Sequence, residues 1–170
     1  MYVIIGFLVL VAAFIIWWLF FTARDIFIRQ ECGGRIRFVV HRKWKRVQDP
    51  FAPLSLLNVK DNSTIQITPF PKRIDSDVLR HAIEVGAKRD EASSAEVSII
   101  VSEIQAGAQL RGYYYFSTDR KVRPGGWAFK MSGSGVIGET TLNFTILSHN
   151  AYPEGMKEGF EMLLNAKMAQ

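Results

Sequence analysis

An uninterrupted apolar run of twenty residues near the N-terminus constrains this chain more than any other feature. Residues 2–21 read YVIIGFLVLVAAFIIWWLFF, and the Tyr2 phenol is their only hydroxyl. A helix of this length rises about 30 Å, which matches the hydrocarbon core of a bilayer. Backbone groups in lipid must satisfy one another, so a spanning segment of this kind has to be helical. The run therefore predicts a single N-terminal transmembrane helix.

A cleaved signal peptide and a buried core helix are the two other interpretations of this run. A signal peptide has a shorter apolar stretch, a basic start and small residues near its end. Here no basic side chain precedes the run, and bulky residues occupy positions 17–21. A core helix is rarely apolar on every face. A retained anchor is therefore favoured.

Two sets of residues in the run have expected roles in the membrane. Aromatic rings favour the interface with water, and small residues allow a partner helix to approach closely. The expected interface residues are Tyr2, Trp17, Trp18 and Phe21, and the expected helix-packing residues are Gly6, Ala12 and Ala13.

Basic residues follow the apolar run, and none precedes it. Residues 24–46 contain eight Lys or Arg, and six of these lie in residues 35–46 without any acid. The positive-inside bias predicts a single-pass protein of a cell inner membrane, with its N-terminus outside and its globular domain in the cytoplasm. Anionic lipid headgroups attract such a cluster. The expected lipid contacts are Arg35, Arg37, Arg42, Lys43, Lys45 and Arg46.

The pattern after the run predicts one α+β domain. Residues 1–31 are expected to form the transmembrane helix and a helical juxtamembrane stem, and residues 35–170 the globular domain. Alternation of apolar and polar residues predicts strands, and apolar residues at helical spacing predict helices. The predicted fold is an antiparallel sheet with two packed helices. The expected strands are 35–47, 54–60, 64–70, 96–105, 110–117, 127–132 and 140–148, and the expected helices begin at residue 75 and cover 153–168.

Candidate catalytic and cofactor motifs in the sequence are weak. Residues 133–138 match the dinucleotide pattern G-x-G-x-x-G, but a β-branched, alternating segment follows where a helix would be required. A glycine-rich hairpin is the favoured interpretation. The histidines at positions 41, 81 and 149 lie on different expected elements, and Cys32 is the only cysteine. We therefore predict no catalytic residue, no cofactor, no metal and no enzymatic activity.

Two aromatic segments are candidate contact sites. Trp44 lies within the basic strand, which favours either nucleic-acid stacking or, as we prefer, a protected sheet edge facing solvent or lipid. Nucleic acid is therefore an unlikely partner. The run at residues 113–116 should place alternate rings outward, beside an acid and a base. The expected partner contacts are Trp44, Tyr113, Tyr115, Asp119 and Arg120.

The C-terminal half resembles the PsbP/DcrB/Mog1 sandwich group in style. The resembling parts are Tyr113-Tyr-Tyr-Phe-Ser-Thr-Asp119 and Leu142-Asn-Phe-Thr-Ile-Leu-Ser148, which leads into the closing helix at residues 153–167. Together they cover less than half of the chain. The resemblance implies a non-enzymatic binding or assembly factor, such as those that attach to a photosystem.

Two functional hypotheses follow from an anchor, a compact domain and the absence of a reactive motif. The first is a non-enzymatic, single-span accessory subunit that stabilises or caps a larger membrane complex, with integral membrane subunits as partners. A photosynthetic or respiratory energy-converting complex is one candidate. The alternative is a membrane-tethered binding module or immunity-type protein that recognises a soluble partner.

Overall fold

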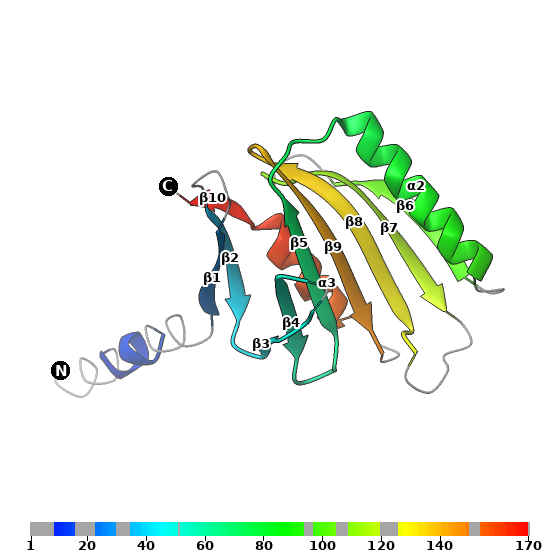
Figure 1. The fold of residues 1–170 in the computed structure, drawn as a ribbon. Helices are drawn as coiled ribbons and strands as arrows, with labels where there is room; N and C mark the ends of the chain where they lie inside the picture. The colour runs from blue at the N-terminus through cyan, green and yellow to red at the C-terminus, as the bar shows by residue number, and fades with distance from the viewer. Residues whose placement is uncertain are drawn as a thin grey trace.

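The fold is the predicted α+β class, with antiparallel sheets and two long helices (Figure 1). The computed structural model describes residues 9–15, 23–29, 35–50, 52–93, 97–104, 109–119, 126–149 and 154–169. The elements are β1 (Ala23–Arg29), β2 (Arg35–His41), β3 (Trp44–Val47), β4 (Leu54–Asn58), β5 (Thr64–Phe70), α2 (Ser76–Ser93), β6 (Val97–Glu103), β7 (Arg111–Asp119), β8 (Phe129–Ile137), β9 (Thr140–Ser148), α3 (Glu154–Leu164) and β10 (Lys167–Ala169).

A seven-stranded sheet in the order β3-β4-β5-β9-β8-β7-β6 forms the centre of the domain. Every neighbouring pair is antiparallel. The pairing of β5 with β9, where Ile65 lies opposite Ile146, joins the first half of the chain to the second. The hairpin expected around residues 61–63 is confirmed, and Asn62 has the left-handed φ of 60° that suits its turn.

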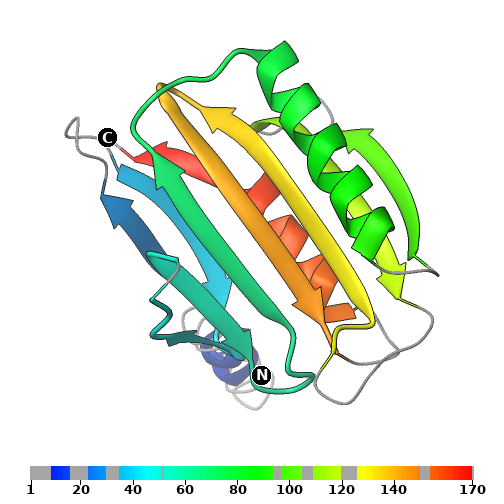
Figure 2. The same ribbon diagram turned by 45° about the vertical axis from the view of Figure 1, so that its right-hand side comes forward.

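The two helices cover opposite faces of this sheet (Figure 2). The alternation along β7 shows the division, because Tyr115 packs with Ile83 and Ala87 of α2, whereas the Tyr114 ring packs at a tilt against Phe160 of α3. The expectation that alternate rings of residues 113–116 face outward is therefore wrong. Both faces of β7 carry a helix, so its rings enter two separate clusters.

A second sheet, in the order β1-β2-β10, packs beside α3. The prediction of a helical stem at residues 22–31 is wrong, because residues 23–29 form the first strand of this sheet. Those residues pair with β2 along its whole length, and Ile26 lies opposite Phe38 and packs against the core. Pairing with the amphipathic strand β2 has overridden the helical preference of these residues, as is common for short segments with alternating residues.

The expected strand at residues 35–47 is two strands, which belong to different sheets. In β2 the predicted alternation is confirmed, with Ile36, Phe38 and Val40 buried and their neighbours exposed. A turn at Arg42 and Lys43 then redirects the chain into β3. The periodicity of two continues across this turn, which is why the sequence did not reveal it.

The glycine-rich hairpin expected at residues 133–138 is confirmed, but its turn is shorter than expected, because residues 133–137 continue β8. Gly133 and Gly135 lie within β8, while Gly138 has a φ of +59° in the turn to β9. A Cβ on Gly133 would come within 2.2 Å of the Phe144 ring. The spacing therefore reflects close packing inside the sheet.

The closing helix is shorter than expected. It ends at Leu164, and residues expected to continue it form β10, where Lys167 pairs with Arg37 of β2. The backbone N–H of Met168 also donates to the Gln109 side chain, at 2.9 Å. These contacts satisfy backbone groups that a further turn of helix would have used.

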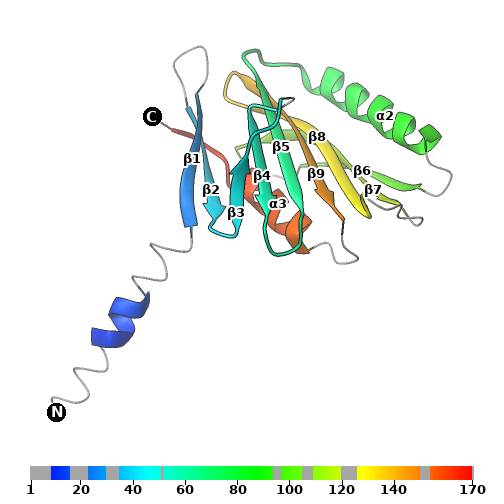
Figure 3. The same ribbon diagram turned by 60° about the horizontal axis from the view of Figure 1, so that its bottom comes forward.

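The described part of the apolar run, residues 9–15, is helical and lies apart from the sheets (Figure 3). All seven residues are exposed, including Leu10 at 70% and Phe14 at 58%. No helix within the described residues is both long and apolar enough to cross a bilayer. The rest of the expected span, residues 2–8 and 16–21, lies outside the described residues.

Candidate functional site

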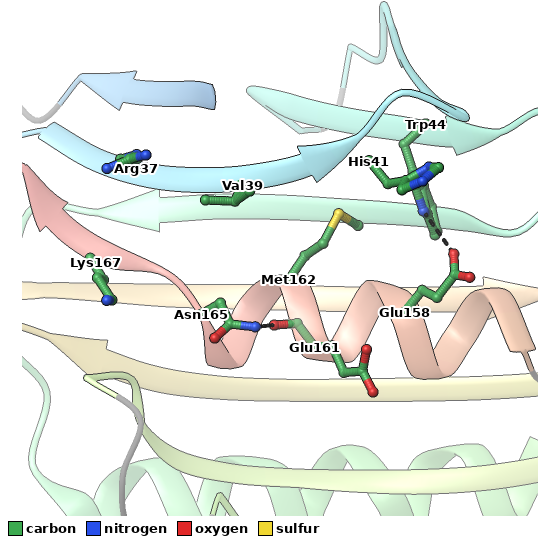
Figure 4. Close-up of a pocket in the computed structure, with 9 residues that line it drawn as sticks. All are labelled: Arg37, Val39, His41, Trp44, Glu158, Glu161, Met162, Asn165 and Lys167. Carbon is green, nitrogen blue, oxygen red and sulfur yellow. Dashed lines mark hydrogen bonds between the residues drawn. The ribbon is translucent and has the colours of Figure 1, made fainter. Parts of the chain in front are cut away.

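A groove of about 570 Å³ lies between β2 and α3 and is the best-formed candidate site (Figure 4). Its two walls come from segments more than a hundred residues apart in the chain. The lining residues are Arg37, Val39, His41, Trp44, Glu158, Glu161, Met162, Asn165 and Lys167.

The β2 wall is made by the side chains that do not enter the core. Arg37, Val39 and His41 are exposed, because the intervening residues point inward. Val39 is 40% exposed, so it gives this wall an apolar centre. The strand's alternation therefore fixes both the core and the groove surface.

The α3 wall comes from the flank of the helix beside its buried stripe. Met156, Gly159 and Leu163 face the core, whereas Glu158 and Glu161 keep solvent contact. Met162 lies between these sets at 8% exposure and contributes an apolar surface to the groove. Residues three and four apart lie on one helix face, so positions 158, 161, 162 and 165 line one wall.

Trp44 closes one end of the groove. It is 0% exposed and packs in the core, where a Cβ on Gly159 would lie 3.5 Å from its ring. Its Nε1 donates to Glu158 Oε2 at 3.4 Å, and Lys43 Nζ forms an ion pair with the same carboxylate. The expected role of Trp44 in partner contact is therefore wrong, because the turn after β2 directs the ring against α3, where it is fully buried.

The charges along the groove are separated. The carboxylates Glu158 and Glu161 lie toward the Trp44 end, whereas Arg37 and Lys167 lie together at the β10 end (Figure 4). Val39 and Met162 lie between them. The groove therefore combines an apolar middle with ends of opposite sign.

A second polar cluster joins α2 to the sheet. Lys130 Nζ lies 2.6 Å from Asp90 Oδ2, and the Tyr115 hydroxyl donates to the same oxygen at 2.8 Å. Lys130 also lies over the rings of Tyr115 and Trp127, at 5.6 and 6.0 Å from their centroids. This Asp90–Lys130–Tyr115 cluster fixes the C-terminal half of α2 to β7 and β8.

Burial and the shared carboxylate alter the acid–base properties of that cluster. Burial raises the pKa of Tyr115 above its usual value, since the phenolate loses hydration. Burial alone would lower the pKa of Lys130, but the hydrogen bond and attraction from Asp90 raise it overall. Both groups thus keep their protons at neutral pH.

The tyrosines expected on a partner-contact patch face α2. Tyr115 is only 5% exposed, and the hydroxyl of half-buried Tyr113 lies 3.1 Å from Ser76 Oγ at the start of that helix. Asp119 is half-buried at the end of β7, and Arg120 lies outside the described residues. The proposed outward patch at Tyr113 and Tyr115 is therefore wrong, because α2 covers it.

The structure divides the expected lipid contacts into two groups. Arg35 and Arg37 lie at the start of β2, whereas Arg42, Lys45 and Arg46 lie at or after its end, and all five are exposed. Lys43 is half-buried by its ion pair with Glu158.

Two of the membrane residues expected from the apolar run lie within the described residues. Ala12 and Ala13 are exposed on the helical segment 9–15. The remaining expected residues, Tyr2, Gly6, Trp17, Trp18 and Phe21, lie outside the described residues.

The residues of the α3 wall were missed by the sequence interpretation. Glu158, Glu161 and Asn165 recur at helical spacing, which marks an outward flank but does not show what lies beside it. Only the packing of α3 next to β2 makes them a groove. Within the described residues, no group of three His, Cys, Asp or Glu side chains is placed to hold a metal ion.

Comparison with known proteins provides no assignment for this site. No family model matches the sequence, and a search of curated proteins finds no match.

Proposed function

We propose that this chain is a non-enzymatic, single-span accessory subunit that stabilises or caps a larger membrane protein complex. The observation that carries the proposal is the exposed apolar helix at residues 9–15, which stands apart from a well-packed sheet domain. An apolar surface of this kind is costly in water and marks a lipid or protein contact. Residues 2–21 would provide the anchor, and integral membrane subunits would be the partners.

The register of the small sheet supports this arrangement. Ala23, the second residue after the apolar run, pairs with His41 at the end of β2. The exposed Arg42 follows directly, and Lys45 and Arg46 lie on the next strand. The basic turn would then lie at the anionic lipid headgroups, where each Lys or Arg contributes about 1 kcal/mol.

The proposed location is a cell inner membrane, with the N-terminus outside and the domain in the cytoplasm. The support is the distribution of charge, because all Lys and Arg residues follow the apolar run. Moving them across the membrane would oppose its potential at about 2.3 kcal/mol per charge per 100 mV.

Purification in a mild detergent from the native membrane tests the accessory-subunit proposal. A C-terminally tagged full-length chain should carry integral membrane proteins with it in a fixed stoichiometry, measured by quantitative mass spectrometry. Leu10→Asp should release the chain from the membrane and abolish its association with these proteins. Val101→Asp, at an exposed residue of β6, serves as the control. Recovery of the unaltered chain as a clean monomer would contradict the proposal.

The groove beside β2 favours a second candidate, a membrane-tethered binding module or immunity-type protein. Its apolar centre and separated charges would suit a soluble polypeptide partner. In that case the chain should still bind its soluble partner after the membrane complex is removed. This binding should depend on groove residues such as Val39. The implied relationship to the PsbP/DcrB/Mog1 group remains a prediction that agrees with either role.

A further inference from the structure

We propose that the groove between β2 and α3 binds the extended C-terminal tail of a partner polypeptide, as an added strand on the open edge of β2. The inference deepens the proposed role as a partner-binding subunit by naming the site and the chemistry of the bound segment. It depends on the pairing of β2, the shape of the groove and the order of its charges.

The edge of β2 that faces the groove is only partly paired. On one side, β1 pairs with the whole strand, from Ala23 opposite His41 to Arg29 opposite Arg35. On the other side, β10 reaches no further than Lys167 opposite Arg37. Within the described residues, positions 38–41 therefore have a strand partner on one side only. Such an edge is a template for an incoming strand.

The groove continues the line of β10 along this edge. Val39 and His41 form one side, and Met162 of α3 and Asn165, directly after that helix, form the other. The β10 strand closes one end, and the Trp44–Glu158 contact closes the other (Figure 4). Four strand residues extend about 13 Å, so the site suits a short segment rather than a long strand.

The charges give the bound segment a direction. A strand antiparallel to β2, as β10 is, would begin near Glu158 and end near Arg37 and Lys167. Its carboxyl terminus would then meet two cations, and a basic residue at its start would meet the Glu161 carboxylate, beside Glu158 that already pairs with Lys43. Apolar residues between these ends would contact Val39 and Met162. The matching tail is therefore basic, then alternately apolar, with a free terminal carboxylate.

Fluorescence anisotropy with a defined peptide tests this site on the full-length chain in detergent micelles. The probe is fluorescein-labelled Lys-Thr-Val-Thr with a free carboxyl terminus, which matches the four positions of β2 that lack a second strand partner. We expect saturable binding that weakens roughly tenfold when the terminus is amidated, which corresponds to about 1.4 kcal/mol. N-methylation of alternate amides should abolish binding, because it removes the donors that pair with β2. The peptide Asp-Thr-Val-Thr, which carries an acid in place of the lysine, should bind more weakly.

Two exposed valines provide a matched pair of variants. Val39 is 40% exposed within the groove, and Val47 is 38% exposed on β3. Val39→Lys should remove peptide binding, while Val47→Lys should leave it unchanged. Lys167→Glu should weaken binding of the free-carboxylate peptide and eliminate its advantage over the amidated form. Circular dichroism checks that each variant keeps its helix and strand content.

Several outcomes would overturn the inference. They are no saturable binding, equal binding of the N-methylated peptide, or equal loss in the Val39→Lys and Val47→Lys variants. If peptide binding fails but integral membrane proteins still co-purify with the chain, only the groove assignment falls. If the peptide binds but no membrane partner co-purifies, the accessory-subunit proposal falls and the binding-module candidate replaces it.

Discussion

At the scale of single residues, two buried or half-buried side chains join elements that are distant in sequence. Trp44 joins the turn after β2 to α3, through Glu158 and through the space left by Gly159. Lys130 joins β8 to α2 through Asp90. Each contact places a polar group where water is scarce, so loss of one partner leaves the other poorly solvated.

Removal of either partner in the Lys130–Asp90 pair should destabilise the domain. The side chains are 20% and 18% exposed, so solvent replaces the lost contact poorly. We expect Lys130→Met and Asp90→Asn each to lower the free energy of unfolding by about 2 kcal/mol. Urea denaturation of the full chain in micelles measures the change. In the exposed Arg80–Glu84 pair, Arg80→Ala should cost less than about 0.5 kcal/mol. Equal losses of unfolding free energy in the two pairs would contradict the larger contribution assigned to the Lys130–Asp90 pair.

The same cluster predicts a loss of stability at alkaline pH. The folded pKa of Tyr115 is raised above 10.0 and that of Lys130 above 10.5. A raised folded pKa contributes stability that is complete below the unfolded pKa and is lost as the pH rises through the folded value. The difference in unfolding free energy between the natural chain and a Tyr115→Phe, Lys130→Met variant should therefore be constant from about pH 7 to pH 9 and shrink above about pH 10. A difference that grows with alkaline pH would refute this.

At the scale of elements, close packing determines which strands and helices can meet. The strand β8 carries Gly133 where the Phe144 ring of β9 lies across it. The helix α3 carries Gly159 where Trp44 and Ile146 approach. The helix α2 also contains a glycine, Gly86, but a Cβ there would lie 3.4 Å from Tyr115, close to ordinary contact. The same residue type therefore has different consequences in a strand and in a helix.

Two glycine-to-alanine substitutions should change stability in opposite directions. Gly133→Ala would place a methyl group 2.2 Å from the buried Phe144 ring, so we expect a loss of about 1–3 kcal/mol from overpacking. Gly86→Ala should stabilise α2 by up to about 1 kcal/mol, because alanine loses less backbone entropy in a helix. Thermal and urea unfolding measure both changes. Stabilisation by Gly133→Ala would show that the ring can move aside freely.

At the scale of the whole molecule, β1 begins beside the end of β2 that carries the basic turn. The register places Ala23 opposite His41, so the exposed Arg42 belongs to the end where the chain leaves the run. Arg35 lies at the other end of the strand, about 20 Å away for six residue steps. Under the proposed anchoring, this asymmetry gives the domain a membrane-proximal and a membrane-distal end.

Distance-dependent quenching should distinguish these two ends. With the full chain in nanodiscs containing anionic lipid, a bimane probe at Arg42→Cys should be quenched by headgroup-labelled lipid more strongly than one at Arg35→Cys. Both variants carry Cys32→Ser, which removes the single native cysteine. Equal quenching at the two positions would contradict the proposed orientation of the domain.

Reporter fusions test the sidedness of the domain. A C-terminal reporter that is active only in the cytoplasm should be active in a bacterial host, whereas one that requires export should be silent. The reason is the eight basic residues between positions 24 and 46, which resist translocation. An active exported reporter would place the domain outside the cytoplasm and favour the extracytoplasmic arrangement common in the PsbP-like group.

The sequence by itself determined the local features of this protein. The alternation of Ile36, Phe38 and Val40 predicted β2, and helical spacing predicted α2 and α3. Turn residues predicted the β4–β5 hairpin, and β-branched residues after Gly138 favoured a hairpin strand over a dinucleotide loop. These features depend on neighbours within a few positions, so the order of residues is sufficient to reveal them.

Only the tertiary structure decided which surfaces meet. Trp44 and Tyr115 were expected outside and are buried, because α3 and α2 cover opposite faces of one sheet. Residues 23–29 and 167–169 form strands because β2 supplies an edge on each side. The groove itself joins Val39 to Met162 across the gap between β2 and α3. Such pairings are set by long-range packing, which no local periodicity contains.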